Sequence, residues 1–383
     1  NFYWLAQPLL YWLYQLIKFS FLTFIYKEAI MKTLNKTLLA TAISGLALSS
    51  AVSVQAESFD SLYKDGSVDI SFRYRVESND VEATAADTAL ANTLKSRATI
   101  KTGSVYGFSA LVEGDNVFHV TEDFNSTENG NTDYDKVVDP ETTQLNQAYL
   151  QYSLDGTTAK LGNQRIVLDN QRHVGGVAFR QDEATFDAIS VSTTALENAT
   201  IFAAFSDNLN NIKNENIEAD FTLLNAKYAV SKELATTAFY YGIDSDGDTL
   251  DTFGLRATGS AAGFGFEAEV ATQDDETNNT LYLHLAGSKK IAGVKATLGY
   301  EMMGSDDGEA SFNTPLGTNH KFLGWSDVYL SAAQWGTNGI TDIYASAVTK
   351  VAGIKLVGQF HSFSSTEGSD DMGTELGFLA AKK

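Results

Sequence analysis

Residues 67–77 read SVDISFRYRVE, and this stretch decides the fold class. Apolar side chains stand at every second position, and polar or charged side chains fill the positions between them. The apolar set is Val68, Ile70, Phe72, Tyr74 and Val76. Because successive side chains of a strand point to opposite faces, the stretch predicts an amphipathic β-strand with one apolar and one polar face.

The same alternation returns along the chain and predicts about sixteen strands. Their expected bounds are 67–78, 92–102, 105–114, 143–154, 157–167, 184–193, 199–206, 220–230, 233–243, 249–258, 264–273, 280–288, 294–303, 340–349, 354–363 and 372–381. Very short turns alternate with longer polar loops, as expected for a barrel with two unequal rims. We therefore predict an all-β fold, a transmembrane up-and-down antiparallel β-barrel. A soluble β-sandwich is the alternative.

The beginning of the chain predicts export. Residues 31–56 combine a basic start, an apolar centre and a small-residue exit, which are the three parts of a secretory signal peptide. We expect cleavage between Ala56 and Glu57, so that residues 57–383 form the barrel. Residues 1–30 are strongly apolar, and we interpret them as sequence upstream of the true start at Met31. A membrane-spanning helix is the alternative interpretation of residues 1–30.

The composition excludes several functional classes. The 383 residues include 27 Lys+Arg against 48 Asp+Glu, a formal net charge of −21, which is unfavourable for binding nucleic acid. The chain has no Cys, so disulfides, thiolate metal sites and cysteine nucleophiles are excluded. Neither a zinc-protease HExxH motif nor a GxSxG hydrolase motif occurs. We expect no catalytic residue, no enzyme activity, no cofactor, no metal site and no nucleic-acid partner.

The polar face of the strands carries the candidate functional residues. A large transmembrane barrel has lipid outside and water inside, so this face is expected to line a pore. The predicted pore-lining residues are Arg73, Arg75, Lys95, Arg97, Lys101, Glu113, Lys227, Arg256, Glu267, Glu269, Lys295, Glu301 and Lys355. The first two strands place Arg73 and Arg75 beside Lys95 and Arg97. This basic ladder would favour anions, or it would form lumenal salt bridges that only stiffen the wall.

The loop at residues 304–339 is expected to constrict the pore. It is long, and its centre is unusually apolar for a loop. Long loops without strands of their own are usually functional, and exposed apolar groups at an outer rim are costly. The candidate constriction residues are Phe312, Pro315, His320, Phe322 and Trp325. The alternative is a cap packed on neighbouring loops.

Several stretches resemble the alginate-export-type porin family of Gram-negative outer membranes. They are residues 144–150 (QLNQAYL), 161–172 (LGNQRIVLDNQR), 181–188 (QDEATFDA) and the segments 312–316 and 320–325 of the late loop. The resemblance implies a barrel of about eighteen strands. This chain ends at Lys382-Lys383 without the terminal aromatic residue of such barrels, so we expect the last hairpin to be missing.

The resemblance and the basic wall together predict a porin. It would pass small anionic solutes, such as uronates or organic acids, by passive diffusion across the outer membrane. Its expected surroundings are outer-membrane lipid and lipopolysaccharide. An outer-membrane barrel enzyme of the lipase or protease type and a non-conducting structural or adhesion barrel are the alternatives. The sequence leaves the oligomeric state open.

Overall fold

Residues 61–382 are described by a computed structural model of the chain. All the described strands belong to the unit that spans Glu57–Lys383. The predicted upstream segment, the signal peptide and its cleavage site at Ala56 and Glu57 lie outside the described residues. Among the described residues, no helix has both the length and the apolar character needed to cross a bilayer.

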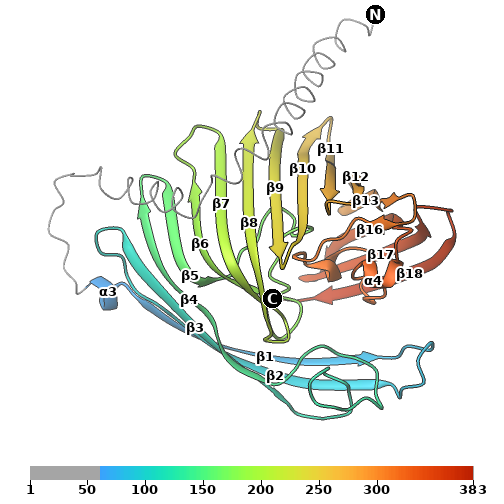
Figure 1. Cartoon of the computed structure of the whole chain (residues 1–383), viewed down its shortest axis with the longest axis horizontal. Helices are drawn as coiled ribbons and strands as arrows, with labels where there is room; N and C mark the ends of the chain where they lie inside the picture. The colour runs from blue at the N-terminus through green and yellow to red at the C-terminus, as the bar shows by residue number, and fades with distance from the viewer. Residues whose placement is uncertain (1–60, 383) are drawn as a thin grey trace, which may run out of the picture. The chain divides into compact units, whose positions relative to one another are not determined.

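The sixteen predicted strands are confirmed, and they form one antiparallel sheet in which each strand pairs with its neighbours in chain order (Figure 1). The sheet consists of β1 (Ser67–Asn79), β2 (Ala89–Lys101), β3 (Phe108–His119), β4 (Thr142–Leu154), β5 (Thr157–Gln164), β6 (Thr185–Thr193), β7 (Ala199–Asn210), β8 (Asn216–Ala229), β9 (Leu234–Ser245), β10 (Asp248–Ala261), β11 (Phe264–Asp274), β12 (Asn279–Ile291), β13 (Val294–Met303), β16 (Ile340–Val351), β17 (Ile354–Ser365) and β18 (Asp371–Ala381). Within the described residues, β1 pairs only with β2, and β18 pairs only with β17.

The remaining elements are short. They comprise the helix α3 (Ser61–Lys64), the two-residue strands β14 (Ser305–Asp306) and β15 (Ala310–Ser311), the 3₁₀ helix η1 (Asn319–Lys321) and the helix α4 (Ala332–Trp335). Ser331 caps α4 by accepting a hydrogen bond from the backbone N–H of Ala333, in a capping box with Gln334. All of these elements except α3 lie in the loop between β13 and β16, so this loop is folded rather than extended.

Several predicted boundaries are wrong. The connections that the expected strand bounds leave at 207–219, 244–248 and 274–279 are shorter, because β7 and β8, β9 and β10, and β11 and β12 extend toward each other. The polar residues there still pair as strands, since long hairpins can extend beyond a membrane. The strand expected at 157–167 ends at Gln164, where its alternation breaks down.

The two faces of the sheet differ as predicted. On one face, Val68, Ile70 and Phe72 are 68%, 65% and 71% exposed, far more than a soluble protein tolerates in a contiguous apolar surface. On the other face, the register places Arg73 opposite Lys95 and Arg97 opposite Asp115. The apolar face therefore suits contact with lipid, and the polar face is called the interior face below.

Three of the short turns have the same backbone conformation. Ala262-Gly263, Ala292-Gly293 and Ala352-Gly353 all have positive φ at both residues, between 48° and 87°. Two-residue hairpin turns with positive φ match the right-handed twist of the flanking strands, and glycine adopts this conformation without strain. These turns hold one rim of the sheet short and tight.

An apolar core occupies part of the interior. Phe186, Phe221, Phe239 and Tyr282 point inward from the strands and are at most 5% exposed. Loop residues complete the cluster, among them Phe312 and Leu316. The interior face is thus polar near β1–β4, and it combines this apolar core with buried polar groups where the loops pack against β6–β13.

Candidate functional site

Residues 165–184, which connect β5 to β6, cross the interior of the sheet. The segment bonds to interior-face side chains on strands that are far apart in the sheet order. These bonds join Arg73 of β1 to the carbonyl of Ala178, Asn225 of β8 to Asp169, Glu269 of β11 to His173, and Glu301 of β13 to Arg172. A segment that contacts four such strands must run between them, so it divides the interior.

A charge cluster joins one end of this segment to β2 and β3. The Arg97 guanidinium donates to both carboxylate oxygens of Asp115, at 2.7 and 2.6 Å. It also lies 3.1 Å from Glu183 and 3.6 Å from Glu113. Arg165 contacts the same two glutamates, 3.1 Å from Glu113 and closer to Glu183. The carboxylates thus neutralise the two arginines, because each charge has a partner of opposite sign.

The other members of the predicted basic ladder are also engaged. Arg73 donates to the carbonyl of Ala178 at 2.9 Å and to the side chain of Gln181 at 2.9 Å. Arg75 pairs with Glu77 and lies 3.5 Å from the buried carboxylate of Asp139. The structure therefore favours the salt-bridge alternative for this ladder, in which the cations anchor the crossing segment.

A second charge cluster anchors the middle of the segment. The wholly buried Arg172 lies 2.6 Å from Glu301. His173 lies 2.6 Å from Glu269, whose other oxygen accepts from Arg256 at 2.6 Å. Because an isolated charge in such surroundings is costly, this pairing fixes the position of the segment.

All the predicted pore-lining residues lie on the interior face, as the strand register shows. They fall into two groups. Those near the crossing segment are paired, as described above. By contrast, no carboxylate within residues 61–382 forms an ion pair with the four exposed lysines close to short turns, which are Lys101, Lys227, Lys295 and Lys355.

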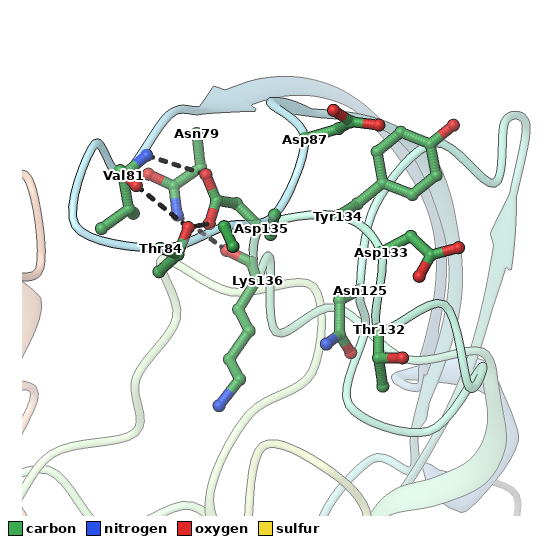
Figure 2. Close-up of a pocket in the computed structure, with 12 residues that line it drawn as sticks. Asn79, Val81, Thr84, Asp87, Asn125, Thr132, Asp133, Tyr134, Asp135 and Lys136 are labelled. Carbon is green, nitrogen blue, oxygen red and sulfur yellow. Dashed lines mark hydrogen bonds between the residues drawn. The ribbon is translucent and has the colours of Figure 1, made fainter.

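A cavity of about 450 Å³ adjoins the crossing segment on the interior face of β5–β8. Its lining has three cationic residues, Lys160, Arg165 and Lys227, and one acidic residue, Asp169. Hydroxyl groups, among them those of Thr158 and Ser192, contribute to the polar surface. Its position beside short turns makes it a candidate vestibule for a solute. A second cavity, of about 730 Å³, lies among the outer loops at residues 79–87 and 125–136; Figure 2 shows Asp135 bonding Val81 and Thr84 at its edge.

The predicted constriction loop packs on the crossing segment. Phe312 is buried in the apolar core, and Phe322 lies under the Arg172 guanidinium. His320 stacks on Phe179 at 3.3 Å between ring centres. Trp325 donates its backbone N–H to Glu375 of β18.

Pro315, the remaining candidate constriction residue, is exposed. The loop between β13 and β16 therefore supports the crossing segment from one side and contacts the wall through Gln273 of β11 and Glu375 of β18.

Residues 165–184 were not predicted to cross the interior. Two of the stretches that carry the family resemblance overlap this segment, but loop residues have no periodicity to indicate where they fold. Arg172, His173, Arg180 and Glu183 gave no sign that each would meet a charged partner far away in the sequence. An odd concentration of charged residues in an otherwise apolar loop is the signal that could have revealed it.

Burial changes the acidity of carboxyl groups at the end of the segment. Burial raises the pKa of Asp182 to about 7, and hydrogen bonds from the Glu183 backbone and Gln144 only partly oppose this. Burial also raises the pKa of Asp139. For Glu183 burial acts in the same direction, but Arg165 and Arg97 hold its pKa below the ordinary value. Asp182 is thus the carboxyl group of the segment that titrates near neutral pH.

Replacing Asp182 with Asn should stabilise the folded protein at pH 8 and change its stability little at pH 4. A raised folded-state pKa means that Asp182 contributes its full stability below its unfolded pKa of about 3.9, and loses it as the pH rises through about 7. The expected gain at pH 8 is on the order of 3 kcal/mol. Denaturant unfolding in detergent at both pH values measures it.

Asp275→Asn is the matched control, because hydrogen bonds from Asn278 and Thr277 outweigh burial and lower the pKa of this turn residue. That variant should lose stability at pH 8. Equal effects of Asp182→Asn at pH 4 and pH 8 would contradict the assignment.

The fold and the charged interior define an outer-membrane channel protein. The chain belongs to the alginate export family, whose model matches residues 65–304. None of the curated proteins compared with this chain matches it.

Solved structures with the same fold include OccAB4 of Acinetobacter baumannii, at 10% identity and a TM-score of 0.63 over 82% of this chain and 88% of that one. OpdO of Pseudomonas aeruginosa is 11% identical with a TM-score of 0.64, over 85% and 88%. The outer membrane protein opdK of the same organism is also 11% identical with a TM-score of 0.64, over 83% and 88%. The family places this chain in the outer membrane.

Proposed function

We propose that this outer-membrane channel passes small anionic solutes by diffusion and has no enzyme activity. The observation that carries the proposal is the set of exposed interior lysines near the short turns. Lys101, Lys227, Lys295 and Lys355 have no carboxylate partner among residues 61–382, unlike Arg75 of β1 and Arg97 of β2. Unpaired cations in a confined aqueous path attract anions.

The location of these lysines determines how they act. Short turns of outer-membrane barrels face the periplasm, so the lysines lie at the periplasmic mouth. Lys227 also lines the vestibule, beside Lys160 and Arg165. Carboxylate-bearing solutes such as uronates or organic acids fit this lining, because both ammonium and hydroxyl groups can bond to them.

Single-channel recording of the protein in planar bilayers tests the proposal. In a salt gradient the reversal potential should indicate anion preference, and the preference should weaken as rising salt shortens the screening length. A uronate should reduce the current more than the corresponding neutral sugar does. Absence of conductance would support the structural-barrel alternative. Hydrolysis of ester or peptide substrates that occurs only when the protein is present would support the enzyme alternative.

A further inference from the structure

The loop between β3 and β4 holds a group of metal-ligating side chains that has no part in the channel interior. His119 is the last residue of β3, Glu122 lies in the loop, and Glu141 immediately precedes β4. One ligand atom from each residue lies within 4.8 Å of those of the other two. Long loops of outer-membrane barrels face the outside of the cell, so the group belongs to the external surface.

His119 is held in the orientation that a metal ligand requires. Its side chain is 2% exposed, and its ring packs edge-on against the buried Phe124. Its Nε2 atom lies 2.9 Å from the carbonyl oxygen of Asp139 and must donate a proton to it. Metal-bound histidines commonly donate their second ring N–H to a backbone carbonyl in this way. The neutral ring then presents the lone pair of Nδ1 to the carboxylates.

The electrostatics around Nδ1 call for a cation. Nδ1 faces both oxygens of Glu122, at 3.2 and 3.3 Å. The lone pair of Nδ1 and those of the carboxylate oxygens repel each other unless a proton or a metal ion lies between them. Within residues 61–382, neither Glu122 nor Glu141 forms an ion pair with Lys or Arg. Two ligand atoms bound to zinc at about 2.0–2.1 Å and at a tetrahedral angle lie about 3.4 Å apart, close to the 3.2 and 3.3 Å between Nδ1 and the Glu122 oxygens.

We propose that His119, Glu122 and Glu141 bind one divalent zinc-type ion. One imidazole and two carboxylates suit zinc better than calcium, which takes oxygen ligands almost entirely. The ion joins the end of β3, the first turn of the loop and the start of β4. It also secures Asp139, whose carboxylate accepts the backbone N–H of Gln181 at 2.8 Å. The site thereby braces the loop that supports one end of the crossing segment.

Zinc titration of the untagged, chelator-treated protein in detergent tests the site. The wild type should bind one zinc ion per chain, and Ca²⁺ should bind far more weakly. Glu122→Gln and Glu141→Gln should each lower zinc affinity by about 100-fold, since loss of an outer-shell partner alone costs 10–100-fold. Glu122 is 58% exposed, so its replacement is not expected to impair folding.

Glu128→Gln is the matched control, because Glu128 is an exposed glutamate of the same loop that lies outside the cluster. It should bind zinc like the wild type. Co²⁺ provides a second measurement, since its visible absorption reports nitrogen and oxygen ligation and should change in His119→Asn. Absence of saturable zinc binding in the wild type, or binding unaffected by both glutamate substitutions, would overturn the proposal.

Discussion

Replacing residues 170–180 with a short glycine-serine linker should raise single-channel conductance several-fold. These residues divide the interior, and the side chains of Arg180, His173 and Arg172 contact β1, β11 and β13 respectively. Removing them opens the cross-section, because β1–β13 are held together by their own ladder rather than by the segment. Planar-bilayer recording measures the effect, and liposome swelling with neutral sugars of increasing size provides an independent estimate of the opening.

A glycine-serine replacement of residues 80–86, in the outer loop between β1 and β2, serves as control and should leave conductance almost unchanged. Deleting residues 317–338 should increase conductance by a smaller factor, because that loop packs on the crossing segment and reaches the wall mainly at Glu375. Unchanged conductance in a folded variant that lacks residues 170–180 would reject the segment as the constriction.

Replacing Lys101, Lys227, Lys295 and Lys355 together with Gln should move the reversal potential strongly toward cation preference. The substitution removes four interior charges that have no acidic partner among the described residues, and it keeps side-chain polarity and approximate size. The acidic residues of the outer loops then dominate the field along the path. Recording in a fixed salt gradient measures the shift, which should be largest at low ionic strength.

A matched set of four lysines lies away from the interior face: Lys64, Lys136, Lys213 and Lys289. Their replacement by Gln should leave selectivity nearly unchanged. Arg97→Gln should behave differently again, because it removes both hydrogen bonds to the buried Asp115 and leaves that carboxylate only Lys95, at 3.8 Å. This variant should cost about 3 kcal/mol of stability. A reversal potential that the quadruple interior variant does not move would remove the support for anionic cargo.

The alternation of residues 67–77 and its repeats predicted the strands, the antiparallel order and the face on which each charged residue lies. This worked because strand periodicity is a local property, and the register then follows from which face is apolar. Strand periodicity could not predict which of the interior lysines and arginines form ion pairs and which do not. Arg97 and Lys101 lie on one strand and one face, yet Arg97 pairs with Asp115, Glu113 and Glu183, whereas Lys101 pairs with no carboxylate in the part of the chain that the structure describes.

The loops explain this limit. Glu183 and Arg172 are close in sequence, but their partners lie on β2 and β13. No periodic pattern encodes a contact between a loop and a distant strand, because it depends on where the whole segment folds. The longest apolar loop was therefore the natural candidate for the constriction, although the segment that crosses the interior is the shorter one between β5 and β6.

The crossing segment also has a mechanical consequence. A curved sheet one strand thick resists sideways compression poorly, since bending it breaks no hydrogen bond between strands. The segment ties opposite stretches of wall together through Arg73 at one end and the Arg172–Glu301 pair near the other. It therefore braces the wall, so that the pore and the surrounding sheet change shape together. Lateral stress in the surrounding membrane, which would deform an unbraced wall, is carried through this hydrogen bond and this ion pair.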